Sequence, residues 1–157
     1  MRYKVSRASN NDLPLMQRFF YQTVMAHGAA IFTKEEILRY SRLAANKRYW
    51  RQKFINDFVY NAKLNGEIVG SFLLNRNGTI GYIFVHQDYQ RKGIAKALYN
   101  ALEKVARDAG MVELRTEINM ATKSFFQKNG YTITKEIKPS KNGEILIFCG
   151  VKKISEI

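Results

Sequence analysis

The stretch YIFVHQDYQRKGIAKAL, residues 82–98, decides the fold. An apolar run typical of a strand ends near Val85, a basic loop containing Gly93 follows, and an amphipathic helix begins at once. The apolar residues that predict this helix recur at helical spacing, namely Ile94, Ala97, Leu98, Ala101 and Val105. The first turn of a helix exposes unpaired N–H groups at the positive end of its dipole. The junction therefore predicts an anion-binding site that suits a pyrophosphate.

This signal is weak when it stands alone, because a basic pair such as Arg91-Lys92 before a helix is more often a solvated turn. Two better-known phosphate motifs are absent. The chain contains neither G-x-x-x-x-G-K-[ST] nor G-x-G-x-x-G. The nature of the anion must therefore be inferred from the rest of the chain.

Strand and helix patterns alternate on both sides of the junction. Before it, we expect a strand over 3–7, helices from 13 to about 28 and from Thr33 toward 45, and three antiparallel strands over 58–64, 67–74 and 79–85. Thr33 and Glu36 have capping-box spacing, and Asn65-Gly66 and Asn77-Gly78 are turn signals. After the junction, the helix ends at Gly110 and is followed by a strand over 112–119, a short helix over 121–130 and strands over 131–138 and 144–153. The pattern predicts one mixed α/β (α+β) domain over residues 1–157.

Composition narrows the class of protein. The 157 residues carry a formal net charge of +13, and 46% of them are hydrophobic, which indicates a basic globular domain. No apolar run approaches the roughly 18 residues of a membrane span, and the N-terminus has no secretory pattern, so we expect a cytoplasmic protein without membrane contact. Cys149 has no partner for an internal disulfide and is predicted to be a buried packing thiol rather than a nucleophile. No metal-binding cluster is predicted.

Residues Gln90-Arg91-Lys92-Gly93-Ile94-Ala95 fit the Q/R-x-x-G-x-G/A signature of the GNAT superfamily of N-acetyltransferases, and the sequence resembles that family. A second family motif is matched by Asn119, Phe126 and Gly130-Tyr131. The resemblance covers nearly the whole chain. It implies the GNAT fold, a mixed and mostly antiparallel central sheet of six or seven strands flanked by four helices. A narrower resemblance is to a bacterial subgroup of YafP-type acetyltransferases.

The resemblance also implies a cosubstrate, acetyl-CoA, and residues that hold it. The backbone amides of the loop would bind its pyrophosphate, and the side chains of Arg91 and Lys92 would add positive charge. The loop residues are Gln90, Arg91, Lys92, Gly93, Ile94 and Ala95. The backbone of Phe84 and Val85 would pair with the pantetheine arm, and one amide there would polarise the thioester carbonyl. Asn119 would bind the pantetheine or cap the following helix, and both roles can coexist. Phe126 would pack along the pantetheine or in the core.

Two positions depart from the family pattern. Many members carry, at the position of Phe126, a tyrosine that is thought to protonate the departing thiolate. Either another residue donates that proton, or none is needed, because a thiol with a pKa near 8.5 is a tolerable leaving anion. Some members also have a glutamate as general base where this chain has Thr79, so the base must lie elsewhere or be water.

Glu117 is the first candidate for the general base, because strand alternation puts it on the same face as Asn119. A surface carboxylate on a solvated strand face is the alternative. Tyr82 and His86, at the end of the strand before the basic loop, are further candidates, and for His86 an exposed loop residue is the plainer interpretation. His27, near a helix end, is weaker still.

Residues 39–53 are rich in Lys and Arg and contain no acid. In the implied fold this segment borders the acceptor site, where Trp50 and Tyr49 could stack on a planar ring. A solvated basic helix face is the commoner explanation, yet the charge would also steer an acidic or aromatic acceptor, or a phosphate backbone.

We therefore predict an acetyl-CoA-dependent N-acetyltransferase that moves the acetyl group to a primary amine of a small molecule by direct attack. One alternative is a GNAT-type enzyme that acetylates charged tRNA or a protein amine; nucleic acid is the less favoured partner. Another is a non-catalytic acyl-CoA sensor or basic nucleic-acid-binding module. The chain is expected to be a monomer or a homodimer.

Overall fold

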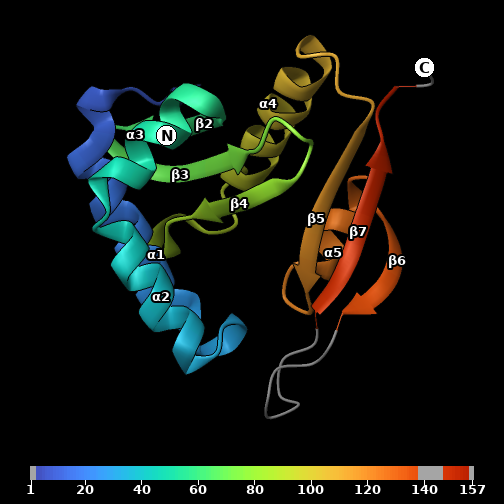
Figure 1. Ribbon diagram of the computed structural model, residues 1–157, viewed down its shortest axis with the longest axis horizontal. Helices are drawn as coiled ribbons and strands as arrows, with labels where there is room; N and C mark the ends of the chain where they lie inside the picture. The colour runs from blue at the N-terminus through green and yellow to red at the C-terminus, as the bar shows by residue number, and fades with distance from the viewer. Residues whose placement is uncertain (1–2, 138–146, 156–157) are drawn as a thin grey trace.

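The computed structural model describes residues 3–137 and 147–155, which form seven strands and five α-helices (Figure 1). The strands are β1 (Lys4–Arg7), β2 (Phe58–Leu64), β3 (Glu67–Leu74), β4 (Ile80–Val85), β5 (Glu113–Asn119), β6 (Thr132–Ile137) and β7 (Ile147–Lys153). The helices are α1 (Leu13–Ile31), α2 (Lys34–Ala44), α3 (Lys47–Asn56), α4 (Ile94–Asp108) and α5 (Lys123–Lys128), with short 3₁₀ turns η1 (Asn10–Asp12) and η2 (Gln87–Tyr89). The predicted order is confirmed apart from one additional helix, and predicted strand residues 138 and 144–146 lie outside the described residues.

Local signals account for the turns and helix starts that the sequence predicts. Asn65 and Gly66 have φ values of 51° and 80°, the left-handed conformation of a two-residue hairpin turn, and they join β2 to β3. Glu36 N–H donates to Thr33 Oγ1 at 3.1 Å, and Thr33 N–H donates to Glu36 Oε1 at 3.0 Å. These contacts confirm the predicted hairpin and the predicted capping box.

Two features of the N-terminal helices differ from the prediction. α1 continues through Gly28 to Ile31, and Gly28 serves helix packing instead of ending the helix, since a Cβ there would lie 3.0 Å from Ile37 Cγ1 of α2. The described residues also contain five helices where four were expected, because α3 is separate from α2. α3 begins after Asn46, whose Oδ1 accepts a hydrogen bond from Tyr49 N–H at 3.0 Å.

The strands form two antiparallel sheets, ordered β1-β2-β3-β4 and β5-β7-β6. β4 and β5 are edge strands, and a parallel bridge between Thr79 and Arg115 joins them. At this junction Arg115 N–H donates to the Gly78 carbonyl at 2.9 Å, and a Cβ on Gly78 would lie 2.6 Å from the Glu113 carbonyl oxygen. Beyond it the two strands diverge, with β5, β7 and β6 to the right of β4 in Figure 1. The predicted, mostly antiparallel sheet is thus present in two parts.

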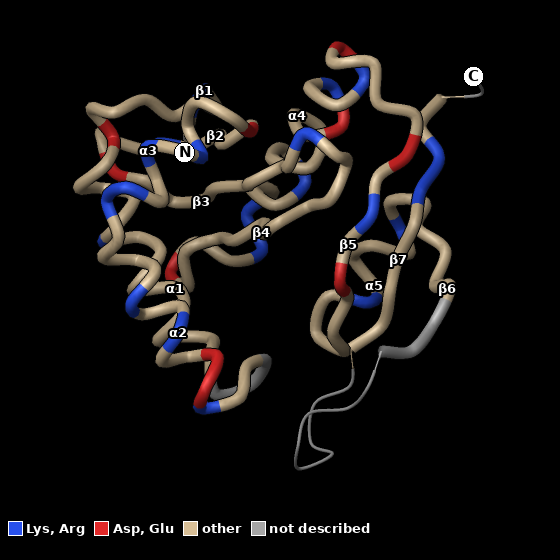
Figure 2. Tube along the Cα trace, viewed as in Figure 1, with Lys and Arg blue, Asp and Glu red and all other residues tan. Residues whose placement is uncertain are grey.

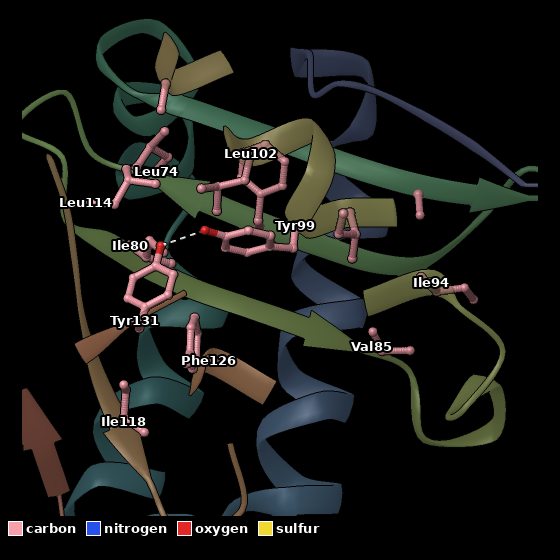
Figure 3. Packing of buried hydrophobic residues seen from close by; sticks show 14 of the residues in the cluster. Leu74, Ile80, Val85, Ile94, Tyr99, Leu102, Leu114, Ile118, Phe126 and Tyr131 are labelled. Atoms are coloured by element: carbon pink, nitrogen blue, oxygen red, sulfur yellow. Dashed lines mark hydrogen bonds between the residues drawn. The ribbon is translucent and has the colours of Figure 1, made fainter. Parts of the chain in front are cut away.

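Apolar clusters cover both faces of the larger sheet. Under α4 and α5, one cluster includes Leu102 and Phe126, and there the Tyr99 hydroxyl donates to the Tyr131 hydroxyl at 3.0 Å (Figure 3). Under α1 and α3, the other cluster includes Phe20 and Trp50. β3 supplies buried residues to both clusters, as a strand covered on both faces does. In the described part of the chain, none of the helices is long and apolar enough to span a membrane.

Candidate active site

α4 begins directly after the basic loop, and its first turn presents unpaired backbone N–H groups. Gly93 is the N-cap residue with a φ of 80°, and Arg91 has a φ of 58°. The helix ladder starts with the hydrogen bond from Ala97 N–H to the Gly93 carbonyl, at 3.1 Å. Among the described residues no acceptor is found for the N–H groups of Gly93, Ile94 and Ala95, which precede it. Such donors at the positive end of a helix are suited to a diphosphate.

Two side chains fix the position of this loop. Gln90 Nε2 donates to the Val85 carbonyl at 2.8 Å, and the Tyr3 hydroxyl donates to the Gly93 carbonyl at 3.2 Å. A Cβ on Gly93 would meet only the Tyr3 hydroxyl, at 4.0 Å, so the space beside Gly93 is open. The loop is therefore held in place by the protein and remains accessible to a ligand.

The loop is also electropositive. Arg91 and Lys92 are exposed, and within residues 3–137 and 147–155 neither takes part in an ion pair. Lys96, in the first turn of α4, donates to Asn129 Oδ1 at 2.8 Å and so reaches from α4 to the end of α5. Unpaired positive charge beside a cluster of N–H donors raises the local concentration of anions.

β4 offers one backbone edge that no strand of its own sheet covers. His86 N–H donates to the Val69 carbonyl at 2.8 Å, which sets the alternation of hydrogen bonds between β4 and β3. By this alternation, the backbone N–H and C=O groups of Ile83 and Val85 point away from β3, and those of Phe84 point toward it. Phe84 and Val85 were the two residues predicted to offer backbone groups to the pantetheine arm. Only Val85 has its backbone N–H and C=O at the open edge, together with Ile83. The backbone groups of Phe84 are directed to β3 within the sheet.

Glu117 and Asn119 share one face of β5, as their spacing predicts, and Glu117 is exposed. The alternate residues are buried on the other face: Leu114, Thr116 and Ile118. Thr122 N–H donates to Asn119 Oδ1 at 3.0 Å, so this oxygen holds the turn before α5, while Asn119 Nδ2 has no partner among the described residues. Cys149 of β7 lies opposite Glu117, and it is half-buried rather than buried as predicted.

The other two candidates for the general base are engaged within the protein. Tyr82 is 8% exposed, and its hydroxyl shares a 2.8 Å hydrogen bond with Ser71 Oγ. Burial raises the pKa of Tyr82 above its ordinary value, against the opposing effect of the Ser71 hydrogen bond, so the phenol keeps its proton at neutral pH. His86 Nδ1 accepts a hydrogen bond from Asp88 N–H at 3.1 Å and so caps η2. Glu117 is the candidate that these contacts leave exposed.

The aromatic residues predicted to touch ligands lie mostly in the core. Trp50 is 0% exposed and its Nε1–H donates to the Ala44 carbonyl at 3.3 Å, so it does not offer the exposed ring that the sequence suggests. The reason is that α3 turns this face onto α1 and β4. Tyr49, beside it, is half-buried. Phe126 is 2% exposed, and its ring centroid lies 5.1 Å from that of Tyr131 (Figure 3). It therefore packs in the core, the second of the two roles predicted for it, and not along an open surface.

Sequence reasoning missed several residues near this site. Tyr3 reaches Gly93 only because β1 pairs with β2, and Ile83 contributes backbone atoms, so neither carries a signal in the sequence. Arg39 and Tyr40 of α2 lie in the basic segment that was predicted to border the acceptor. The Arg39 guanidinium lies 5.1 Å from the centroid of the Tyr40 ring, a contact that the segment's composition does not specify.

The model of the acetyltransferase (GNAT) family matches residues 23–131. This protein belongs to the GNAT family of acetyltransferases. The family resemblance carried by residues 90–95 is thereby confirmed, and with it the class of enzyme, an N-acetyltransferase. The fold expected for this family is confirmed as well.

Similar proteins agree with this assignment. YafP, an uncharacterized N-acetyltransferase of Escherichia coli strain K12, is 24% identical over 125 residues, covering 80% of this chain and 78% of YafP. Acetyltransferase ECA0875 of Pectobacterium atrosepticum is 38% identical over 81 residues, 48% of this chain and 57% of the relative. Among solved structures, a GCN5-related N-acetyltransferase from Rhodopseudomonas palustris has a TM-score of 0.82 at 22% identity, covering 98% of this chain and 97% of that one. PaiA N-acetyltransferase from Thermoplasma acidophilum, solved with coenzyme A, has a TM-score of 0.81 at 19% identity, covering 98% and 99%. At this level of identity the solved structures show the shared fold.

Proposed function

We propose that this GNAT protein transfers the acetyl group of acetyl-CoA to the primary amine of a small-molecule acceptor, with residues 1–157 acting as one N-acetyltransferase domain. The observation that carries the proposal is the cluster of unpaired N–H groups at the start of α4, beside an open Gly93 and two unpaired cations. Structural neighbours support the choice of cosubstrate: PaiA was solved with coenzyme A, and yncA of Salmonella typhimurium, with a TM-score of 0.76, was solved with its cofactor acetyl-CoA.

The residues of the site fit this cosubstrate part by part. The amides from Gly93 to Ala95 would bind the pyrophosphate, with Arg91 and Lys92 adding charge. The open edge of β4 would hold the pantetheine arm through backbone hydrogen bonds, in the way an edge strand accepts another strand. Asn119 Nδ2, free of protein partners in the described structure, would donate to the same arm from the side of β5.

The chemistry needs a base, an oxyanion donor and a leaving group. Glu117 would accept the proton of the acceptor ammonium, directly or through one water. The amine nitrogen then attacks the thioester carbonyl carbon, and the outward N–H of Val85 would donate to the oxygen as it gains charge. The C–S bond breaks as the new amide forms, CoA leaves as the thiolate, and the second proton lost by the nitrogen passes to that thiolate or to water. Because a thiol with a pKa near 8.5 leaves as a tolerable anion, Phe126 at the position of the family's tyrosine is compatible with turnover.

The test places a carboxylate at the predicted diphosphate position. Gly93→Glu should weaken acetyl-CoA binding by about a hundredfold or more, since like charges brought together cost several kcal/mol. Gly66→Glu is the matched control, because Gly66, in the β2–β3 turn, also has a φ of +80°, and a Cβ there would meet no atom within 4 Å. Both variants add the same charge and the same backbone strain. Titration calorimetry with acetyl-CoA measures the difference, and unchanged affinity in Gly93→Glu would contradict the proposed site.

A further inference from the structure

A path of aromatic side chains connects the end of β4 to an exposed arginine on α2. The Phe84 ring lies 5.9 Å from the Phe20 ring, and the Phe20 ring lies 6.4 Å from the Tyr40 ring. The Arg39 guanidinium lies 5.1 Å from the centroid of the Tyr40 ring and donates to the Tyr40 hydroxyl at 3.5 Å. Phe84 and Tyr40 are half-buried, so they present part of their rings to a ligand. The path begins beside Val85, where the proposed function puts the thioester carbonyl.

Arg39 is a cation that the described part of the protein does not neutralise. It is exposed and forms no ion pair there. Glu36, one turn earlier on α2, directs Oε1 to Thr33 N–H in the capping box. The hydrogen bond to Tyr40 is the main cause that raises the pKa of Arg39, and the charges of Glu36 and Glu117 add to it, so the guanidinium keeps its charge. Stacking on a ring also limits the positions that this long side chain adopts.

Glu117 supplies the opposite charge from the other side. It lies on the exposed face of β5, and its charge acts on Arg39 without forming a salt bridge with it. α2 and β5 come from the left and right parts of the molecule in Figure 2, on either side of the region where β4 and β5 diverge. α2 and β5 thus carry one cation and one anion on opposite sides of that region, and in the described structure the two form no salt bridge with each other.

We infer that the acceptor carries a carboxylate in addition to its amine, and that Arg39 binds this carboxylate while Glu117 takes the proton of the ammonium group. The inference rests on the proposed function and names its substrate class, amino acids with an apolar body. A guanidinium binds a carboxylate through two parallel N–H donors, which fixes its orientation. The half-buried rings of Phe84 and Tyr40 suit the apolar body that carries the two charged groups.

The rival occupant is the phosphate backbone of RNA. α2 and α3 carry further exposed cations, namely Lys34, Arg42, Lys47, Arg48 and Arg51. A polyanion would depend on the sum of these charges and lose affinity steeply with salt. A compact amino carboxylate depends on one arginine in one orientation. The structure favours the amino carboxylate. Among the exposed cations of α2 and α3, Arg39 is the one that lies over a ring of the aromatic path, that of Tyr40.

The experiment compares acceptors that differ only in the carboxylate: phenylalanine with phenethylamine, and 6-aminohexanoate with hexylamine. Acetylation by the full-length protein is followed through the release of free CoA thiol. The wild type should show a higher kcat/KM for the carboxylate member of at least one pair. Arg39→Gln should lower that kcat/KM about ten- to hundredfold, the range for a hydrogen bond to a charged group, and change the plain amine less than about twofold. Arg39→Lys keeps the charge without the two-donor geometry and should fall between.

Arg48→Gln is the matched control, since it removes one exposed cation from α3, outside the aromatic path, and should leave the preference unchanged. Equal losses for both members of a pair in Arg39→Gln would overturn the inference, as would a preference for the plain amines or transfer confined to RNA-linked amines. In those cases acetyl transfer still occurs. Absence of transfer to any amine, by contrast, would overturn the proposed function itself.

Discussion

Glu117 is the residue on which the proposed proton transfer depends. Glu117→Gln keeps the size of the side chain and removes the base, so kcat should fall about 10²- to 10⁴-fold, while acetyl-CoA affinity stays within a factor of about two. Glu113→Gln is the control, because Glu113 lies on the same face of β5 and pairs with Arg115 at 3.6 Å near the sheet junction. Steady-state kinetics across pH measures the effect. If the acid limb of the pH–rate profile is the same in Glu117→Gln and wild type, another group is the base.

Single residues also show how far the sequence could go. Gly93 and Thr33 were predictable, because a left-handed N-cap and a capping box are local and depend on neighbours in the chain. Trp50 was not, since its burial depends on how α3 packs against α1 and β4, and an exposed and a buried tryptophan look alike in sequence. Phe84 is a similar case: which way its backbone points is set by the register with β3.

At the scale of elements, α4 is tied to β7 by a group of charged and phenolic side chains. Glu103 accepts hydrogen bonds from Lys152 Nζ of β7 at 2.8 Å and from the Arg107 guanidinium at 2.7 Å. Beside them the Tyr99 and Tyr131 hydroxyls are hydrogen-bonded, and burial raises the pKa of Tyr131 to about 12. Desolvation would raise the pKa of Glu103, yet the hydrogen bonds from Lys152 and Arg107 outweigh it, and the pKa falls to about 2. The helix whose first N–H groups are proposed to bind the diphosphate is thus fixed to the smaller sheet.

This tie predicts a specific loss of stability in acid. Because the folded pKa of Glu103 lies below its ordinary value of 4.5, its contribution is present above pH 4.5 and is lost as the pH falls toward 2. Glu103→Gln should therefore lower the free energy of unfolding at pH 7, and the difference from wild type should shrink through that window. Asp108→Asn, at the exposed pair with Lys104, is the control and should show little effect. Denaturant unfolding at a series of pH values measures both, and a difference independent of pH would contradict the assignment.

The element order was within reach of the sequence, because hairpin turns, caps and helical periodicity are short-range. α3 was missed because its short-range signals are weak. Asn46 is an ordinary N-cap residue, but the basic run that follows it has few apolar positions, and only Trp50 and Phe54 of α3 are buried. So narrow an apolar face is typical of a solvent-exposed segment and does not indicate a separate helix. The helix is stabilised by packing against the core, which the local sequence does not show.

For the whole molecule, the decisive feature is that two sheets meet at one end and separate at the other. Local patterns predicted seven strands, but not that the pairing between β4 and β5 stops at Thr79 and Arg115. The consequence is functional, because an edge strand with unpaired backbone groups accepts an extended ligand arm. On either side of that edge the described structure places positive charge outside any ion pair, Arg91 and Lys92 at the proposed diphosphate end and Arg39 on the proposed acceptor side.

The junction between the sheets should therefore control both stability and ligand binding. In Gly78→Ala, the new Cβ would lie 2.6 Å from the Glu113 carbonyl oxygen, on a residue with a φ of +90°. The left-handed backbone alone costs an alanine about 1–2 kcal/mol, which Gly66→Ala, with a φ of +80° and nothing within 4 Å, should show by itself. The clash should add about 1–3 kcal/mol in Gly78→Ala. Because relief of that clash moves β4 relative to β5, the KM for acetyl-CoA should rise in Gly78→Ala and not in Gly66→Ala. Chemical denaturation and steady-state kinetics on the two variants measure this, and equal KM values would show that the separation of the sheets does not set the binding of the cosubstrate.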